Sequence, residues 1–89
     1  MNILKKAKAG NELQNADCVV TVEPSTTLSI ELSSVVKNQY GKAILESVRD
    51  ELRKYDITAG KIFIEDRGAI DPVLRARMET AIKRGVNEE

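Results

Sequence analysis

The 89-residue chain contains no histidine and no tryptophan. Without histidine, a Ser-His-Asp triad, a histidine general base and a histidine-rich metal site are all excluded. The single cysteine, Cys18, cannot form an intramolecular disulfide, which is typical of a reducing compartment. No apolar run approaches the length of a membrane span, and residues 1–8 lack the apolar centre of a signal peptide. We therefore expect a soluble protein of the cytoplasm.

The chain also lacks net charge and is poor in aromatic residues. Fourteen Lys and Arg residues balance fourteen Asp and Glu residues, which argues against a nucleic-acid surface or a polybasic membrane surface. Only two tyrosines and one phenylalanine are present, so the core of this single small domain must consist mainly of Ile, Leu, Val and Ala. Such a core leaves little room for an internal pocket. We expect chemistry at contacts with partners instead.

Three segments have the pattern of β-strands. Residues 18–22 (CVVTV) are rich in β-branched side chains, and residues 28–33 (LSIELS) alternate between apolar and polar. The turn that contains Pro24 separates these two segments, which predicts a hairpin. Residues 61–65 (KIFIE) form the third predicted strand. Residues 1–17, which are polar around Gly10, are predicted to be a mobile arm.

The longer of two predicted helices follows the second strand. Its apolar side chains recur about every four residues, and Ser33 or Ser34 is its expected N-cap. Gly41 inside it predicts a bend, a break or a close packing contact. The members of the apolar stripe are Val36, Tyr40, Ile44, Val48, Leu52 and Tyr55.

The second predicted helix begins at Asp71, as N-cap, and Pro72, and it ends at Gly85. Its apolar stripe consists of Leu74, Met78, Ala81 and Ile82. The order strand-strand-helix-strand-helix predicts an α+β two-layer sandwich, with two helices on a sheet of three strands or slightly more. The domain is expected to span residues 18–89, and its strand-helix-strand unit is compatible with a parallel crossover.

Few side chains have an obvious chemical role. Cys18 begins an apolar strand, where cysteine more often serves as a small hydrophobe than as a nucleophile. Glu65, Asp66 and Asp71 are clustered, but their spacing is not that of a calcium loop, so no metal site is predicted. Ser47 lies in mid-helix beside the apolar stripe, which makes it a poor attachment point.

Three arginines form the one candidate surface. Arg75 and Arg77 lie on different flanks of the last predicted helix, and Arg67 lies in the preceding turn. Together they are compatible with a surface for phosphate or for acidic side chains. The alternative is an ordinary solvated helix flank, which spacing alone favours.

A resemblance to a known family covers most of the chain. Residues 65–71 (EDRGAID) and 73–77 (VLRAR) resemble the Asp-Lys-Gly-Ala-Leu-Asp-Cys-Val-Leu-Arg-Ala-Arg segment of the acyl carrier protein, or gamma subunit, of citrate lyase. Residues 33–41 (SSVVKNQYG) resemble that family's Ser-Val-x-x-Gln-Phe-Gly stretch, and residues 9–10 match its Ala-Gly. The differences at Arg67, Ile70 and Pro72 are compatible with the predicted turn and helix start.

This resemblance implies a carrier subunit without catalytic residues of its own. In the family, a serine of the N-terminal arm carries a phosphoribosyl dephospho-coenzyme A prosthetic group through a phosphodiester. The thiol of that group holds acetyl, which the alpha subunit exchanges for citryl, and the beta subunit cleaves the citryl thioester. The implied partners are therefore the citrate lyase alpha and beta subunits, with neither nucleic acid nor membrane.

The arm of this chain departs from the family pattern. Counting back from Asp17 places Asn15 at the position of the modified serine, and counting on from Gly10 places Gln14 there. Neither side chain can form the phosphodiester, and no serine precedes Ser25. The chain is then an engineered apo form, a homologue that uses another site, or a member that never carries the group. The alternative function is an unmodified, stand-alone protein-interaction module on the same fold.

Overall fold

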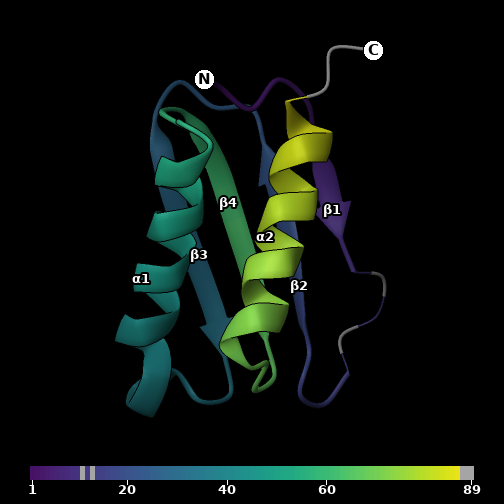
Figure 1. The fold of residues 1–89 in the computed structure, drawn as a ribbon, viewed down its shortest axis with the longest axis vertical. Helices are drawn as coiled ribbons and strands as arrows, with labels where there is room; N and C mark the ends of the chain where they lie inside the picture. Colours follow the sequence, from purple (N-terminus) through teal and green to yellow (C-terminus); the bar gives the residue numbers. More distant parts are fainter. Residues whose placement is uncertain (11, 13, 87–89) are drawn as a thin grey trace.

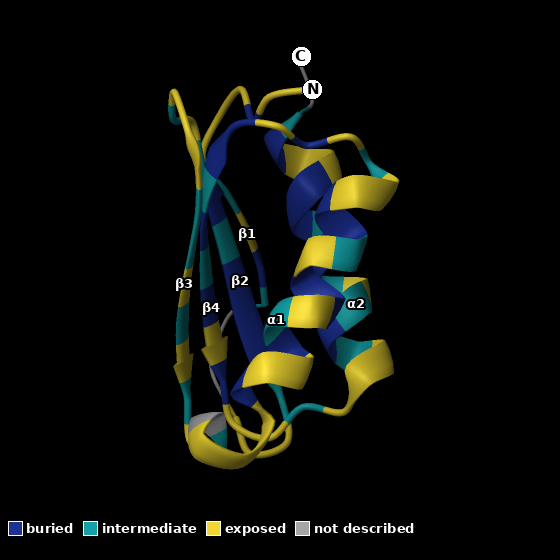
Figure 2. Ribbon diagram, turned by 90° about the vertical axis from the view of Figure 1, so that its left-hand side faces the viewer, coloured by how far each residue is buried: buried dark blue, intermediate teal, exposed yellow. Residues whose placement is uncertain are grey.

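Two helices cover one face of a four-stranded sheet (Figures 1 and 2). The computed structural model describes residues 1–10, 12 and 14–86. In chain order the elements are β1 (Ala7–Ala9), β2 (Cys18–Glu23), β3 (Leu28–Ser34), α1 (Lys37–Lys54), β4 (Gly60–Asp66) and α2 (Asp71–Gly85). The predicted α+β two-layer sandwich is confirmed. No helix within the described ranges is long and apolar enough to cross a membrane.

The strand order is β1-β2-β4-β3. The predicted hairpin is wrong because β4 lies between β2 and β3, antiparallel to β2 and parallel to β3. Ile64 pairs with Val20 on one side, and Ile62 pairs with Ile30 on the other. The parallel β3-α1-β4 crossover places α1 against β3 and α2. Alternation along one strand indicates its buried face, but it does not indicate which strand lies beside it.

The first residues belong to the sheet and core rather than to an arm. β1 pairs with β2, and Ile3 is buried. The backbone N–H groups of Leu4 and Lys5 donate to the carbonyl of Gly85 over 2.8 and 3.1 Å. The chain comes so close here that a Cβ on Gly85 would lie 2.7 Å from Cγ2 of Val22. The sequence does not indicate this strand, because exposed lysines alternate with small inward side chains.

Both predicted apolar stripes face the sheet, with one exception. Ile44, Val48 and Leu52 of α1 are buried, and so are all four predicted residues of α2. Tyr40 is wrongly predicted to be in the core, because its side chain is 57% exposed. α1 continues through Gly41, so that glycine is not a break between two helices.

The two helix starts differ from the prediction by a few residues. α1 has Val36 as its N-cap, and the Ser34 hydroxyl accepts the Val36 N–H over 3.1 Å while Ser34 remains in β3. α2 has Ile70 as its N-cap, so Asp71 is its first residue and Pro72 follows. The predicted serine and aspartate caps are therefore wrong, because tertiary partners engage both side chains.

Candidate functional site

The two predicted attachment positions lie in the loop between β1 and β2. Gln14 and Asn15 are both exposed there. Residues 11 and 13 of the same loop lie outside the described residues. The end of the loop is joined to the turn after β4, since the Ala16 N–H donates to the Arg67 carbonyl over 2.8 Å. The Arg67 N–H donates in return to the Asp17 carbonyl over 2.9 Å. The family motif around Arg67 thus holds the loop by its backbone.

Asp17 connects the same loop to α2. Its carboxylate lies 3.3 Å from the Arg77 guanidinium and also accepts the N–H of Cys18 over 2.7 Å. Two predicted arginines therefore reach the loop, Arg67 through its backbone and Arg77 through its side chain. The sequence alone indicates no role for Asp17 beyond the alignment.

A mainly polar groove of about 630 Å³ runs from the loop along α2. We call it the loop groove. Arg77, Thr80 and Arg84 share one face of α2, and the Arg84 guanidinium donates to the Lys8 carbonyl over 2.8 Å. The other lining residues are Gly10, Glu12, Gln14 and Asp17. The charges of the lining balance, with two guanidinium groups and the carboxylates of Glu12 and Asp17, and the guanidinium groups are the part that suits an anionic ligand. The spacing of residues 77, 80 and 84 in the sequence indicates that Thr80 and Arg84 share a helix face with Arg77.

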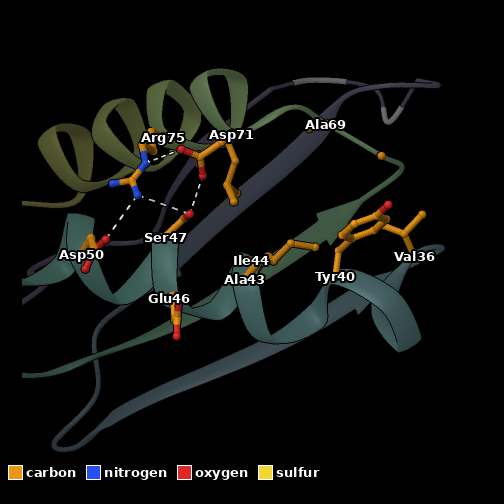
Figure 3. Close-up of a pocket in the computed structure, with 12 residues that line it drawn as sticks. Val36, Tyr40, Ala43, Ile44, Glu46, Ser47, Asp50, Ala69, Asp71 and Arg75 are labelled. Atoms are coloured by element: carbon orange, nitrogen blue, oxygen red, sulfur yellow. Dashed lines mark hydrogen bonds and ion pairs between the residues drawn. The ribbon is translucent and has the colours of Figure 1, made fainter.

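Arg75 lies apart from this groove and faces α1 (Figure 3). Its Nε donates to Oδ2 of Asp71 over 2.6 Å. Its two Nη atoms lie 3.2 Å from carboxylate oxygens of Glu51 and Asp50. Arg75 also donates to the Ser47 hydroxyl over 3.4 Å. The three predicted arginines therefore do not form one surface, and the Arg75 guanidinium is engaged in joining the two helices.

Hydrogen bonds lower the pKa of two carboxylates that lie between α1 and α2. The buried Ser47 hydroxyl donates to Asp71, and this bond, with that from Arg75, lowers the pKa of Asp71 below its ordinary 3.8. Hydrogen bonds from Arg75 and Arg53 lower the pKa of Asp50 in the same way. Both carboxylates are ionised at neutral pH. Ser47 is buried and bonded here, as befits a poor attachment point.

The space between these charges and the turn after β4 is a second groove, of about 550 Å³ (Figure 3). We call it the helix groove. One end is apolar and includes Val36, Tyr40 and Ile44; the other end is charged. Its full lining is Val36, Tyr40, Ala43, Ile44, Glu46, Ser47, Asp50, Gly68, Ala69, Asp71, Leu74 and Arg75.

The remaining chemical candidates have structural roles. Cys18 is fully buried, and burial, followed by the charges of Asp66 and Asp17, raises the pKa of its thiol from 9.0 to about 11. Asp66 accepts hydrogen bonds from the Ser34 hydroxyl and from the N–H groups of Gly68 and Ala69. Residues 1–10, 12 and 14–86 contain no group of three or more Cys, Asp or Glu side chains arranged to hold a metal ion.

Comparison with known proteins gives consistent matches over nearly the whole chain. A family model described as malonate decarboxylase delta subunit, of the ACP type, matches residues 4–85. A citrate lyase acyl carrier protein of Haemophilus ducreyi is 43% identical over 88 residues, which cover 99% of this chain and 92% of that protein. One of Treponema denticola is 40% identical over 84 residues, covering 94% and 95%.

A solved structure agrees with these matches. A chain in the crystal structure of a Pseudomonas malonate decarboxylase hetero-tetramer in complex with malonate superposes with a TM-score of 0.77. The two chains are 26% identical, and the match covers 92% of this chain and 84% of that chain.

Proposed function

This chain belongs to the acyl carrier family of malonate decarboxylase delta subunits and citrate lyase acyl carrier proteins, and we propose that it serves as the carrier subunit of a citrate lyase complex. Members of this class hold acyl groups on a covalently attached prosthetic group. Sequence identity is the observation that favours citrate lyase over malonate decarboxylase. Relatives named for citrate lyase are 39 to 44% identical, whereas the malonate decarboxylase chain is 26% identical.

The proposal places the prosthetic group beside the β1–β2 loop, with its anionic portion in the loop groove. By family resemblance, that group is phosphoribosyl dephospho-coenzyme A. Arg77 and Arg84 would receive its phosphate oxygens, and Arg67 would hold the loop beside them. Guanidinium groups on one helix face are suited to such contacts because they bind phosphate in a fork.

The covalent bond itself does not fit this loop. A phosphodiester to the protein needs a side-chain hydroxyl, and the first 20 residues contain no Ser, Thr or Tyr. Asn15 and Gln14 carry amides instead. Among the residues that line the loop groove, Thr80 is the one with a hydroxyl. Any attachment must therefore use a hydroxyl outside the loop.

We further propose a cytoplasmic complex in which the partners are the citrate lyase alpha and beta subunits. The Cys18 thiol is buried in the core and has no disulfide, as expected for a reducing compartment. The described side chains offer neither a reactive thiol nor a metal cluster, so the partners would supply the catalytic groups. Membership of this family makes a stand-alone interaction module the weaker alternative.

Intact-mass spectrometry of the chain purified from its own host tests the proposal. A mass excess equal to the nucleotide group, together with co-purified alpha and beta subunits, is the expected result. Fragmentation would then locate the hydroxyl that bears the group. A bare chain that associates with neither subunit would contradict the carrier function.

A further inference from the structure

Three large apolar side chains remain exposed at one end of the molecule. Val35 is 71% exposed, Tyr40 57% and Ile70 65%. Val35 follows β3, Tyr40 lies in the first turn of α1, and Ile70 precedes α2. Because β3 and β4 are parallel and their last residues, Ser34 and Asp66, are paired, the segments that follow them leave the sheet at the same end. We call the three side chains the apolar patch. Tyr40 also lines the helix groove, and exposed apolar side chains at one end of a molecule are typical of interaction surfaces.

The helix groove leads from this patch to a region of net negative charge (Figure 3). Its charged lining consists of Glu46, Asp50, Asp71 and Arg75, so that carboxylates outnumber guanidinium groups. Arg75 bonds to Asp50 and Asp71, while Glu46 points away from it (Figure 3). The carboxylates are accessible, since the side chains of Asp50 and Asp71 are 46% and 53% exposed. The surface therefore combines an apolar end with an acidic end.

We infer that the apolar patch and the helix groove together dock an amphipathic segment of a partner subunit, with an apolar anchor on the patch and a Lys or Arg side chain beside Asp50 and Asp71. This inference rests on the proposed function. Charge complementarity favours a basic side chain of a protein as the occupant. The net negative groove repels phosphate groups, and the loop groove, with Arg77 and Arg84, suits them better.

This surface lies next to the turn that holds the β1–β2 loop, as a carrier requires. Gly68 and Ala69 line the helix groove, and their neighbour Arg67 is bonded by its backbone to Ala16 and Asp17 of the loop. A partner seated on the groove thus touches the same turn that holds the loop. Docking there brings the loop next to the partner without any change in the fold.

Binding of the purified citrate lyase alpha and beta subunits, measured by calorimetry, tests the apolar end. We expect Tyr40→Glu and Ile70→Glu each to raise the Kd for one of the subunits about tenfold or more, as at interface anchors. Leu4→Glu is the matched control, because Leu4 is 49% exposed and lies at the opposite end, beside Gly85. Its Kd should change less than about twofold. Circular dichroism checks that every variant folds.

The acidic end is tested by reversing one charge. Glu46→Lys should weaken the same binding about fivefold and flatten its salt dependence, while Glu31→Lys, on the uncovered face of the sheet, should not. Tighter binding by Glu46→Lys would refute a basic occupant.

Two further results separate this inference from the proposed function. If the unaltered chain binds a subunit and all variants bind it equally, the docking surface is wrong and the carrier function stands. If the unaltered chain binds neither subunit, the proposed function fails, and the docking inference fails with it. A homodimer that Ile70→Glu dissociates would make a second copy the occupant and would overturn the partner proposal.

Discussion

Removal of the Asp66 carboxylate should destabilise the turn on which both grooves depend. Asp66 is 3% exposed and accepts three hydrogen bonds: from the Ser34 hydroxyl (2.8 Å), the Gly68 N–H (3.1 Å) and the Ala69 N–H (3.0 Å). Gly68 has a φ of 82°, so glycine allows the chain to curl back around the carboxylate. Asp66→Ala removes all three acceptors at once.

The magnitude follows from the partners. A hydrogen bond to a charged group contributes about 1.5 to 3 kcal/mol, and an unsatisfied buried donor costs about 1 to 3 kcal/mol. Gly68 is exposed and Ala69 half-buried, so water replaces part of the loss at both N–H groups. We expect Asp66→Ala to lower the free energy of unfolding by about 3 kcal/mol. For a domain of this size, that corresponds to a Tm lower by roughly 12 to 24 °C.

Urea unfolding at pH 7, followed by far-UV circular dichroism, measures this change in a protein without tryptophan. The midpoint should fall by roughly 2 to 3 M. Asp66→Asn keeps the size and one acceptor, so about half of the loss should remain. Glu65→Ala is the matched control, because Glu65 is the exposed neighbour on the same strand, and its effect should stay within about 0.5 kcal/mol. Equal effects of Asp66→Ala and Glu65→Ala would refute the reasoning.

Three other predictions concern single side chains. Asn15→Ser, expressed in the native host, should gain the mass of the prosthetic group in intact-mass spectra if the count from Asp17 is right. A gain by Gln14→Ser alone would support the other alignment, and no gain by either would show that a serine restored to the loop is not modified. Ser47→Ala should raise the pKa of Asp71 toward 3.8 in an NMR titration, because the carboxylate loses the hydrogen bond that favours its charged form. The stability that the depressed pKa confers is present above pH 3.8 and lost as the pH falls through the folded-state pKa, so the variant should lose less stability in acid. An unchanged pKa of Asp71 would argue against the bond. Cys18 should resist iodoacetamide at pH 8 in the folded chain, because its thiol pKa of about 11 leaves little thiolate, and should react once urea unfolds it; rapid alkylation of the folded chain would contradict its burial.

Most elements could be predicted from local pattern. Val20 and Val22 in β2, and Leu74 and Met78 in α2, have the periods of a strand and a helix, and all four are buried. β1 was not predicted, because lysines dominate a short strand whose inward residues are mostly small. Tyr40 fits the helical period but lies in the first turn of α1, where it lines the helix groove and is 57% exposed.

The candidate site was predictable only in parts. The spacing of Arg75 and Arg77 places them on different flanks of a helix, but it does not say that α1 lies on one flank and the β1–β2 loop on the other. Asp71 is a plausible cap by sequence, whereas in the structure Ser47 and Arg75, from separate turns, take its oxygens. Such partners are distant in sequence, so no local pattern records them.

The sequence by itself determined the class of fold, the family resemblance and the absence of a hydroxyl in the first 20 residues, because each depends on residue identity or short-range period. Only the tertiary structure decided that β4 separates β2 from β3 and that Arg75 and Arg77 belong to different grooves. It also decided that residues around Arg67 hold the loop. The physical reason is that strand pairing and side-chain partnership are chosen by burial across the whole core, which brings together groups far apart along the chain.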